Sequence, residues 1–203
     1  MQRIRSKTQE LNRRLQPYCK ERQSAMQDFK LENLLTPKDC LTLHRSQIVQ
    51  KIFIMLNEID NLTVEKYNRE DALGCRNYLM FMLCITNALR ASNLINLTIA
   101  DIKNAVHDAE FDAMVIKSAK YKTSMLYGKK CIVVSEQLIS YIMKFCTYLR
   151  PMLVGPGDAK LSDEERVVFL STQKGGSKMN HSAISNGMSQ LFQMVPELKS
   201  KKR

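Results

Sequence analysis

Residues 78–98, YLMFMLCITNALRASNLINLT, combine a long apolar run with one arginine, Arg90, and a short amphipathic segment. From residue 79 to residue 85 the run is apolar on every side of a helix, which is typical of a helix buried in the middle of a fold. The helix is expected to end near Arg90, and Ser92 is expected to cap a second short helix. The apolar side chains of this second helix are expected to face inward: Leu94, Ile95 and Leu97.

Two interpretations of Arg90 follow from this placement. The guanidinium could simply reach water at the end of a buried helix, with its stem packed against apolar neighbours. Alternatively, because a guanidinium is always charged and donates paired hydrogen bonds to oxyanions, it could bind a phosphate. A corner between two helices would hold such a group rigidly.

The composition favours a polyanionic partner. The 203 residues carry 31 Lys and Arg against 20 Asp and Glu, a formal net charge of +11, and 44% of them are hydrophobic. That apolar content is ordinary for a folded domain, whereas the charge is not. Nucleic acid is therefore the expected partner ahead of a membrane surface. The longest apolar stretch, residues 78–89, is too short to span a bilayer, so no membrane is expected.

Cysteine and histidine give no metal or cofactor signature. The six cysteines contain no CxxC pair, and most of them lie in apolar runs, where a free thiol packs as a small hydrophobe. Without a signal peptide at the N-terminus, a reducing compartment without disulfides is expected. The three histidines show no ligand spacing relative to the cysteines, so neither a metal nor a cofactor is expected.

The chain divides into residues 1–32, a basic helical arm or linker, and a domain over residues 33–203. Residues 1–30 carry eight Lys and Arg against three Asp and Glu, with few apolar positions. Thr36 before Pro37 predicts a helix start, and residues 64–89 predict the long central helix.

A change of hydrophobic period predicts a small sheet after the central helix. Residues 112–120 and 129–136 are short β-branched runs that predict an antiparallel hairpin, with residues 98–106 as a third strand. Helices are predicted over residues 135–153, with Ser135 as N-cap, and over residues 180–195. A surface loop and a short buried strand or extended segment at residues 166–172 separate them. The fold class expected from the residues is α+β and mostly helical, with a small three-stranded antiparallel sheet. Between Ala113 and Val134 the sequence contains no acid and five lysines: Lys117, Lys120, Lys122, Lys129 and Lys130.

This order of elements resembles the catalytic domain of the tyrosine recombinases, the phage-integrase and Cre-like fold. The segment ALRASNLINLT resembles the first-arginine motif of the family, KYKTSMLYG resembles its hairpin with a lysine, and VFLSTQKGGSKMNHSAISNGMSQLF resembles the stretch before the second half of its active site. More narrowly, the sequence resembles recombinases of eukaryotic mobile elements of the Crypton and DIRS-like kind, over about residues 33–194.

The resemblance implies roles for two residues. Arg90 corresponds to the first catalytic arginine, which binds the scissile phosphate, and Lys122 to the hairpin lysine, which acts as general acid toward the leaving hydroxyl. Lys120 is the alternative if the register differs by two residues. The other hairpin lysines are expected to bind double-stranded DNA through its phosphates: Lys117, Lys120, Lys129 and Lys130.

The departures from the family are equally informative. Asn93 stands where the family has an acidic residue, and neither the second H-x-x-R motif nor a later nucleophilic tyrosine is present. His181 is interpreted as a surface residue at a helix N-terminus, because Ile184 occupies the position of the arginine that follows in some relatives. As written, the chain is expected to be inactive in strand exchange, since a phosphotyrosyl intermediate needs a nucleophile.

Three functions remain open from the sequence. The main expectation is a nuclear DNA-binding domain related to recombination and integration, lacking the C-terminal part of the catalytic domain. The second is the front portion of an active breaking-rejoining recombinase, completed by a longer product or a partner chain. The third is a domesticated protein-interaction scaffold. The DNA target site and assembly into homo-oligomers on DNA cannot be predicted from the residues.

Overall fold

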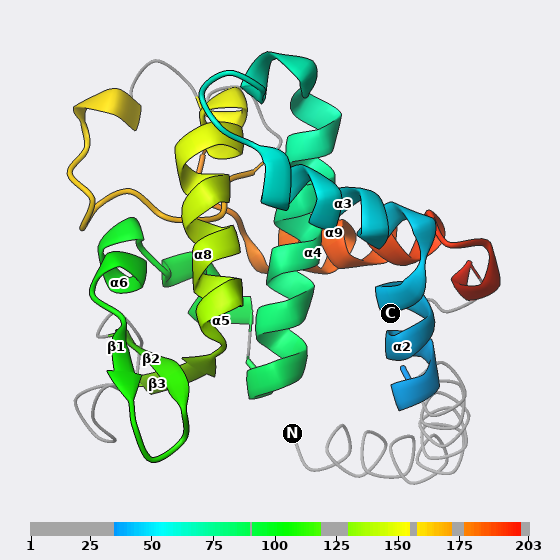
Figure 1. Cartoon of the computed structure of the whole chain (residues 1–203), viewed down its shortest axis with the longest axis horizontal. Coiled ribbons are helices and arrows are strands. Elements are labelled where there is room, and N and C mark those ends of the chain that lie inside the picture. Colours follow the sequence, from blue (N-terminus) through cyan, green and yellow to red (C-terminus); the bar gives the residue numbers. More distant parts are fainter. Residues whose placement is uncertain (1–34, 90, 119–129, 155–157, 172–176, 200–203) are drawn as a thin grey trace, which may run out of the picture.

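The computed structural model of the chain describes residues 35–89, 91–118, 130–154, 158–171 and 177–199. These residues form a mostly helical unit with one small antiparallel sheet, which confirms the α+β class (Figure 1). The expected boundary between a basic arm (residues 1–32) and a domain falls within residues 1–34, which lie outside the described residues.

The first two described helices begin at strong caps. Helix α2 (Pro37–Arg45) starts after Thr36, whose side chain forms a reciprocal capping box with Asp39, as the Thr36–Pro37 signal predicts. The following helix, α3 (Gln47–Glu58), is separate because Ser46 has extended backbone angles and caps it. A short 3₁₀ turn, η1 (Val64–Lys66), then leads to the central helix.

Helix α4 (Arg69–Asn87) is the centre of the fold, as the apolar run predicts. It begins at a capping box of Asn68 and Asp71, five residues after the predicted start at residue 64. In Figure 1 it runs through the middle of the molecule, and it contacts α3, α9, strand β3 and the end of α8. It is therefore covered from several directions, which is why its middle can be apolar all round.

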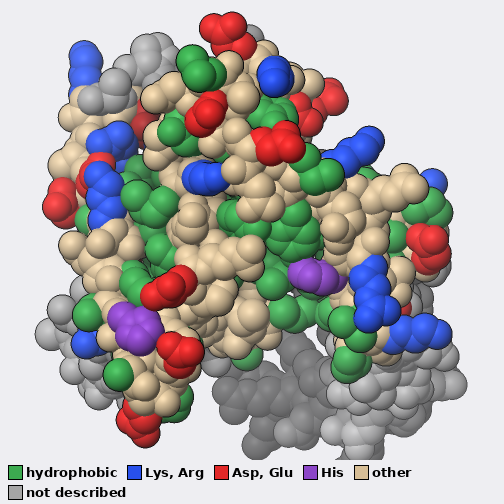
Figure 2. Space-filling model, viewed as in Figure 1, with side chains coloured by type: hydrophobic (Ala, Val, Ile, Leu, Met, Phe, Trp, Pro, Cys, Tyr) green, Lys and Arg blue, Asp and Glu red, His purple; other side chains and the backbone are tan. Residues whose placement is uncertain are grey.

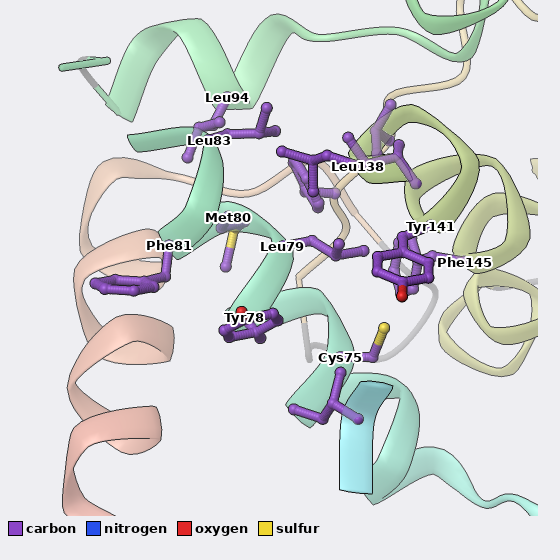
Figure 3. Close-up of a cluster of buried hydrophobic side chains, with 14 of the residues drawn as sticks. Cys75, Tyr78, Leu79, Met80, Phe81, Leu83, Leu94, Leu138, Tyr141 and Phe145 are labelled. Carbon is purple, nitrogen blue, oxygen red and sulfur yellow. The ribbon is translucent and has the colours of Figure 1, made fainter. Parts of the chain in front are cut away.

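Side chains of α4 point to different sides of the helix axis. Figure 3 shows Phe81 directed toward α9, whereas Leu79 and Cys75 are directed toward Tyr141 and Phe145. The two ends of the helix depart from this pattern, since Arg69, Glu70 and Ile85 are exposed. The core thus continues around α4 instead of lying against one face.

Residues 91–103 differ in part from the prediction. Helix α5 (Ala91–Asn96) includes Ser92 as its second residue, so the prediction of Ser92 as the cap is wrong, although the apolar side chains of the segment are buried as expected. The predicted third strand over residues 98–106 is also wrong, because Thr98 and Asp101 form a capping box that starts helix α6 (Ile99–Lys103).

The three strands pair in sequence order. Strand β1 (Val106–Asp108) pairs antiparallel with β2 (Ala113–Ser118), and β2 pairs antiparallel with β3 (Lys130–Val134). The β2–β3 register places Val115 opposite Val133. The predicted pairing of the hairpin strands is confirmed. The third strand of the sheet is β1, which follows helix α6 and was predicted to lie earlier in the chain.

The remaining elements close the fold. Helix α8 (Glu136–Lys144) starts at the predicted cap Ser135 and continues as a π-helical turn, η2 (Phe145–Leu149), and a 3₁₀ turn, η3 (Arg150–Leu153). After η4 (Asp158–Lys160), residues 168–170 are buried, and the predicted extended segment is reduced to isolated β-bridges of Val167 with Thr98 and of Leu170 with Lys178. Helix α9 (His181–Gln193), capped by Asn180, and η5 (Pro196–Leu198) complete the described chain.

Candidate nucleic-acid interface

The residues predicted to bind the phosphate fall at gaps in the described chain. Arg90, between α4 and α5, and three of the hairpin lysines, Lys120, Lys122 and Lys129, lie outside the described residues. Lys117 is exposed on β2, and Lys130 begins β3, where only its backbone is described. The structure therefore describes the elements on both sides of the predicted site.

The end of α4 is fixed immediately before Arg90. Ala88 adopts left-handed backbone angles, with φ 47° and ψ 41°, and its N–H donates to the carbonyl of Cys84. The N–H of Leu89 donates to the same carbonyl at 3.3 Å, and its side chain is buried. Left-handed residues of this kind end helices because they satisfy the last free carbonyls. The chain consequently turns sharply just before Arg90.

Asn87 ties this turn to the outer strand of the sheet. Its side-chain Nδ2 donates to the carbonyl of Val133 at 2.8 Å, and the N–H of Val133 donates to its Oδ1 at 2.7 Å. Two such bonds reproduce the pairing that a neighbouring strand would offer to β3. The last residue of α4 thereby takes the place of a fourth strand at this point.

The two hydrogen bonds between Asn87 and Val133 join the two predicted halves of the site. Arg90 follows Asn87 by three residues, and the lysine-rich segment 119–129 enters β3, which contains Val133. Contacts between α4 and β3 extend this junction. The structure thus brings the chain on one side of Arg90 against the strand that receives the hairpin.

Helix α5 adds two polar residues to this region. Asn93, at the position of the family's acidic residue, is 8% exposed, so a neutral amide is buried where a carboxylate was expected by resemblance. Asn96 accepts a hydrogen bond from the Nζ of Lys178 at 2.6 Å, which connects α5 to the segment before α9. Both amides stabilise the surroundings of the corner without adding charge.

The sheet is electrostatically polarised along its strands. The turn between β1 and β2 carries Asp108, Glu110 and Asp112, whereas the connection from β2 to β3 carries lysines and no acid. Figure 2 shows acidic side chains beside a histidine at the lower left, and Asp112 pairs with His107 in this turn. A polyanion would therefore be repelled from the β1–β2 end and attracted to the β2–β3 end.

Three cations near the far end of α8 are neutralised by ion pairs. Arg150 binds Asp158 with both arms of its guanidinium, at 2.6 and 2.8 Å. Asp163 pairs with both Lys103 and Arg166. These cations stabilise the far end of α8 and the loop beside it, and they leave little free charge for a polyanion there.

His181 and the tyrosines agree with the interpretation from the sequence. His181 is the exposed first residue of α9, and Ile184 is buried in the core, so this turn of the helix has no cation facing a phosphate. Tyr78 is buried and its hydroxyl lies 2.9 Å from Nδ1 of His44; burial, with a smaller effect of Tyr141, raises the pKa of Tyr78. A tyrosine held in this way is a core residue and not a nucleophile.

Thiols and metal ligands contribute no further chemistry in the described ranges. Burial raises the pKa of the Cys75 and Cys146 thiols, so both remain protonated. Cys131 differs from the expected pattern, since it is exposed on β3. No group of three metal-ligating side chains occurs among the residues that the structure describes. Every helix in these ranges is too short or too polar to cross a membrane.

Two important side chains carry no clear signal in the sequence. Asn87 looks like an ordinary polar residue at a helix end, and its role depends on a strand 46 residues later. Arg76 precedes the apolar run by two residues and is almost completely buried. Its position in the predicted buried central helix was the one hint of this role in the sequence.

No model of a known protein family matches the chain, and no curated protein matches it at a significant level.

Proposed function

We propose that this chain is a DNA-binding domain of the tyrosine-recombinase type that binds double-stranded DNA without cleaving it. Arg90 and Lys122 bind one phosphodiester, and Lys117, Lys120, Lys129 and Lys130 bind neighbouring phosphates. The 203 residues contain no H-x-x-R motif and no tyrosine after Tyr148, so binding is the activity proposed for them.

The observation that carries this proposal is the pair of hydrogen bonds between Asn87 and Val133. It supports the proposal because it attaches the chain three residues before Arg90 to the strand that follows the lysine-rich segment. Two cations far apart in sequence can share a phosphate only if their elements are held together. The charges support it as well, because a polyanion is repelled by the acidic β1–β2 turn and attracted to the acid-free β2–β3 connection with its lysines.

The test is a binding titration of the full chain with fluorescent duplex DNA. Affinity is expected to fall steeply with salt, log K decreasing by about 0.9 for each phosphate neutralised. The double substitution Arg90→Ala, Lys122→Ala is expected to weaken binding and to reduce this slope. A titration that stays flat from low to physiological salt would contradict the proposal.

A charge-matched control is available on the other side of the molecule. Arg45 on α2 and Lys51 on α3 are exposed, and in Figure 1 these helices lie away from the sheet. The double substitution Arg45→Ala, Lys51→Ala removes the same charge and is expected to leave the affinity nearly unchanged. Equal losses in both double variants would show that net charge alone drives binding.

The same reagents separate the other two functions. A covalent adduct with a suicide DNA substrate would indicate an active recombinase completed by another chain, and none is expected. If DNA affinity and every cellular effect survive the Arg90, Lys122 substitutions, the chain acts as a protein-interaction scaffold. A nuclear location is part of the proposal, and it is tested by imaging a fluorescent fusion with and without the basic residues 199–203.

A further inference from the structure

A buried arginine in α4, Arg76, has no counter-charge among the residues that the structure describes. The side chain of Arg76 is 2% exposed, and none of the described carboxylates forms an ion pair with it. Buried charges are normally paired, because leaving water without compensation is costly. Burial, with a smaller effect of the Arg69 charge, lowers the pKa of Arg76 to about 10, so the group stays protonated at neutral pH.

Neutral acceptors use only part of its hydrogen-bonding capacity. Nη1 donates to the carbonyl of Leu170 at 2.6 Å, and Nε and Nη2 donate to Oδ1 of Asn77 at 3.1 and 2.7 Å. A guanidinium has five N–H donors, so one on each terminal nitrogen has no acceptor among the described residues. The group is therefore fixed in orientation, yet two donors and its full charge remain available.

Arg76 also lines a cavity with a polar wall. The cavity has a volume of about 250 Å³ and lies between α4, the segment ending at Ser171, and the first turns of α9. Its lining contains no Asp or Glu: Arg76, Ser171, Met179, Asn180, Ser182, Ala183, Asn186, Gly187 and Gln190. The space is large enough for a tetrahedral oxyanion of a few heavy atoms.

Outside the described residues, acids occur in the sequence only within residues 1–34. Residues 119–129, 155–157, 172–176 and 200–203 contain neither Asp nor Glu. The helix α9 also begins at the cavity, where the Asn180 side chain accepts from the N–H of Ala183 and leaves the earlier N–H groups of the turn for another acceptor. Partial positive charge at a helix start adds to the charge of Arg76.

We propose that this cavity binds a small inorganic oxyanion, phosphate or sulfate, with Arg76 as its charged ligand and the first turn of α9 as its second donor set. The anion supplies the counter-charge that the described residues do not. This site is separate from the proposed DNA interface, and the inference does not depend on that function.

The test uses phosphate and sulfate on the full chain without DNA. Each anion is expected to raise the thermal unfolding midpoint, and the increase should saturate with anion concentration. Chloride at the same ionic strength is expected to leave the midpoint unchanged. Comparing the two anions distinguishes a phosphate site from a general oxyanion site. Equal shifts with chloride would overturn the proposal.

A carboxylate placed at the cavity should replace the anion. Substituting Arg76 itself would also remove the bond to Leu170, so Asn186→Asp is the better variant. Asn186 is an exposed residue of α9 that lines the cavity. The aspartate of the variant has nearly the same shape, and its negative charge is expected to weaken phosphate binding about tenfold through like-charge repulsion. The variant is also expected to unfold at a higher temperature than its control in phosphate-free buffer.

The control is Ser185→Asp, one residue earlier on α9 and outside the cavity lining. It adds the same charge to the same helix, and it is expected to keep the phosphate affinity of the parent chain. Equal phosphate affinities for Asn186→Asp and Ser185→Asp would overturn the proposal. Loss of binding only in Asn186→Asp would support it, whatever the DNA titrations show.

Discussion

The side-chain amide of Asn87 pairs with both backbone groups of Val133, accepting from its N–H at 2.7 Å and donating to its carbonyl at 2.8 Å. The last residue of the central helix is thereby attached to the edge of a sheet 46 residues later in the chain. Side-chain hydrogen bonds rarely satisfy both groups of one residue, and asparagine can do so because its amide has a donor and an acceptor side by side.

Substituting Asn87→Ala should destabilise the chain by about 1–3 kcal/mol, because two hydrogen bonds of about 0.5–1.5 kcal/mol each are lost. The measurements are urea unfolding and hydrogen exchange of the Val133 amide, which should exchange faster. Asn61→Ala, at an exposed position after α3, is the control and should have little effect. Protection of Val133 equal to that of the parent would contradict the role given to Asn87.

Substituting Ala88→Gly should stabilise the chain by about 0.5–1 kcal/mol. Ala88 has φ 47°, a conformation that costs an L-residue about 1–2 kcal/mol and glycine almost nothing. Part of this gain is offset by the greater freedom of glycine in the unfolded chain. The measurement is the urea midpoint, and Ala88→Val, which adds a branched side chain at the same angles, should move it in the opposite direction.

Two helical glycines should respond in opposite ways to alanine. A Cβ at Gly187 would lie 2.6 Å from Oδ1 of Asn77, whereas a Cβ at Gly74 would meet nothing within 4 Å. Gly187→Ala should therefore destabilise by about 1–3 kcal/mol, since Asn77 is held by Arg76 and cannot move freely. Gly74→Ala should stabilise by up to about 1 kcal/mol through helix propensity. Thermal unfolding of both variants tests the close packing of α4 against α9.

Acid should weaken the chain partly through Asp163. A hydrogen bond from Lys103, helped by the charge of Arg166 and opposed by partial burial, holds the pKa of Asp163 below its ordinary value. The unfolded state then binds the proton more readily, so the stabilisation is complete above the unfolded pKa of about 4 and is lost as the pH falls through the folded pKa.

The measurement is the urea midpoint between pH 7 and pH 2.5. Asp163→Asn should lower it at neutral pH and should converge with the parent in acid. Glu197→Gln, on the exposed turn η5, is the control and should follow the parent curve throughout. A constant gap between the Asp163→Asn and parent curves would rule out titration of Asp163 as the cause.

Local signals in the sequence determined where some elements begin. Thr36 with Pro37 and Ser135 each start a helix as predicted, since a cap bonds to backbone within three residues and needs no distant partner. The same physics explains the error at residues 98–106, where the Thr98–Asp101 capping box starts a helix in a segment interpreted by its apolar content as a strand.

The tertiary structure alone decided the surroundings of the candidate sites. Asn87 and Arg76 act on Val133 and Leu170, which are 46 and 94 residues away, and no local pattern encodes such partners. The sequence by itself determined the apolar central helix, the hairpin and the position of the basic segment. Which polar side chains hold these parts together depends on contacts that exist only once the chain has folded around α4.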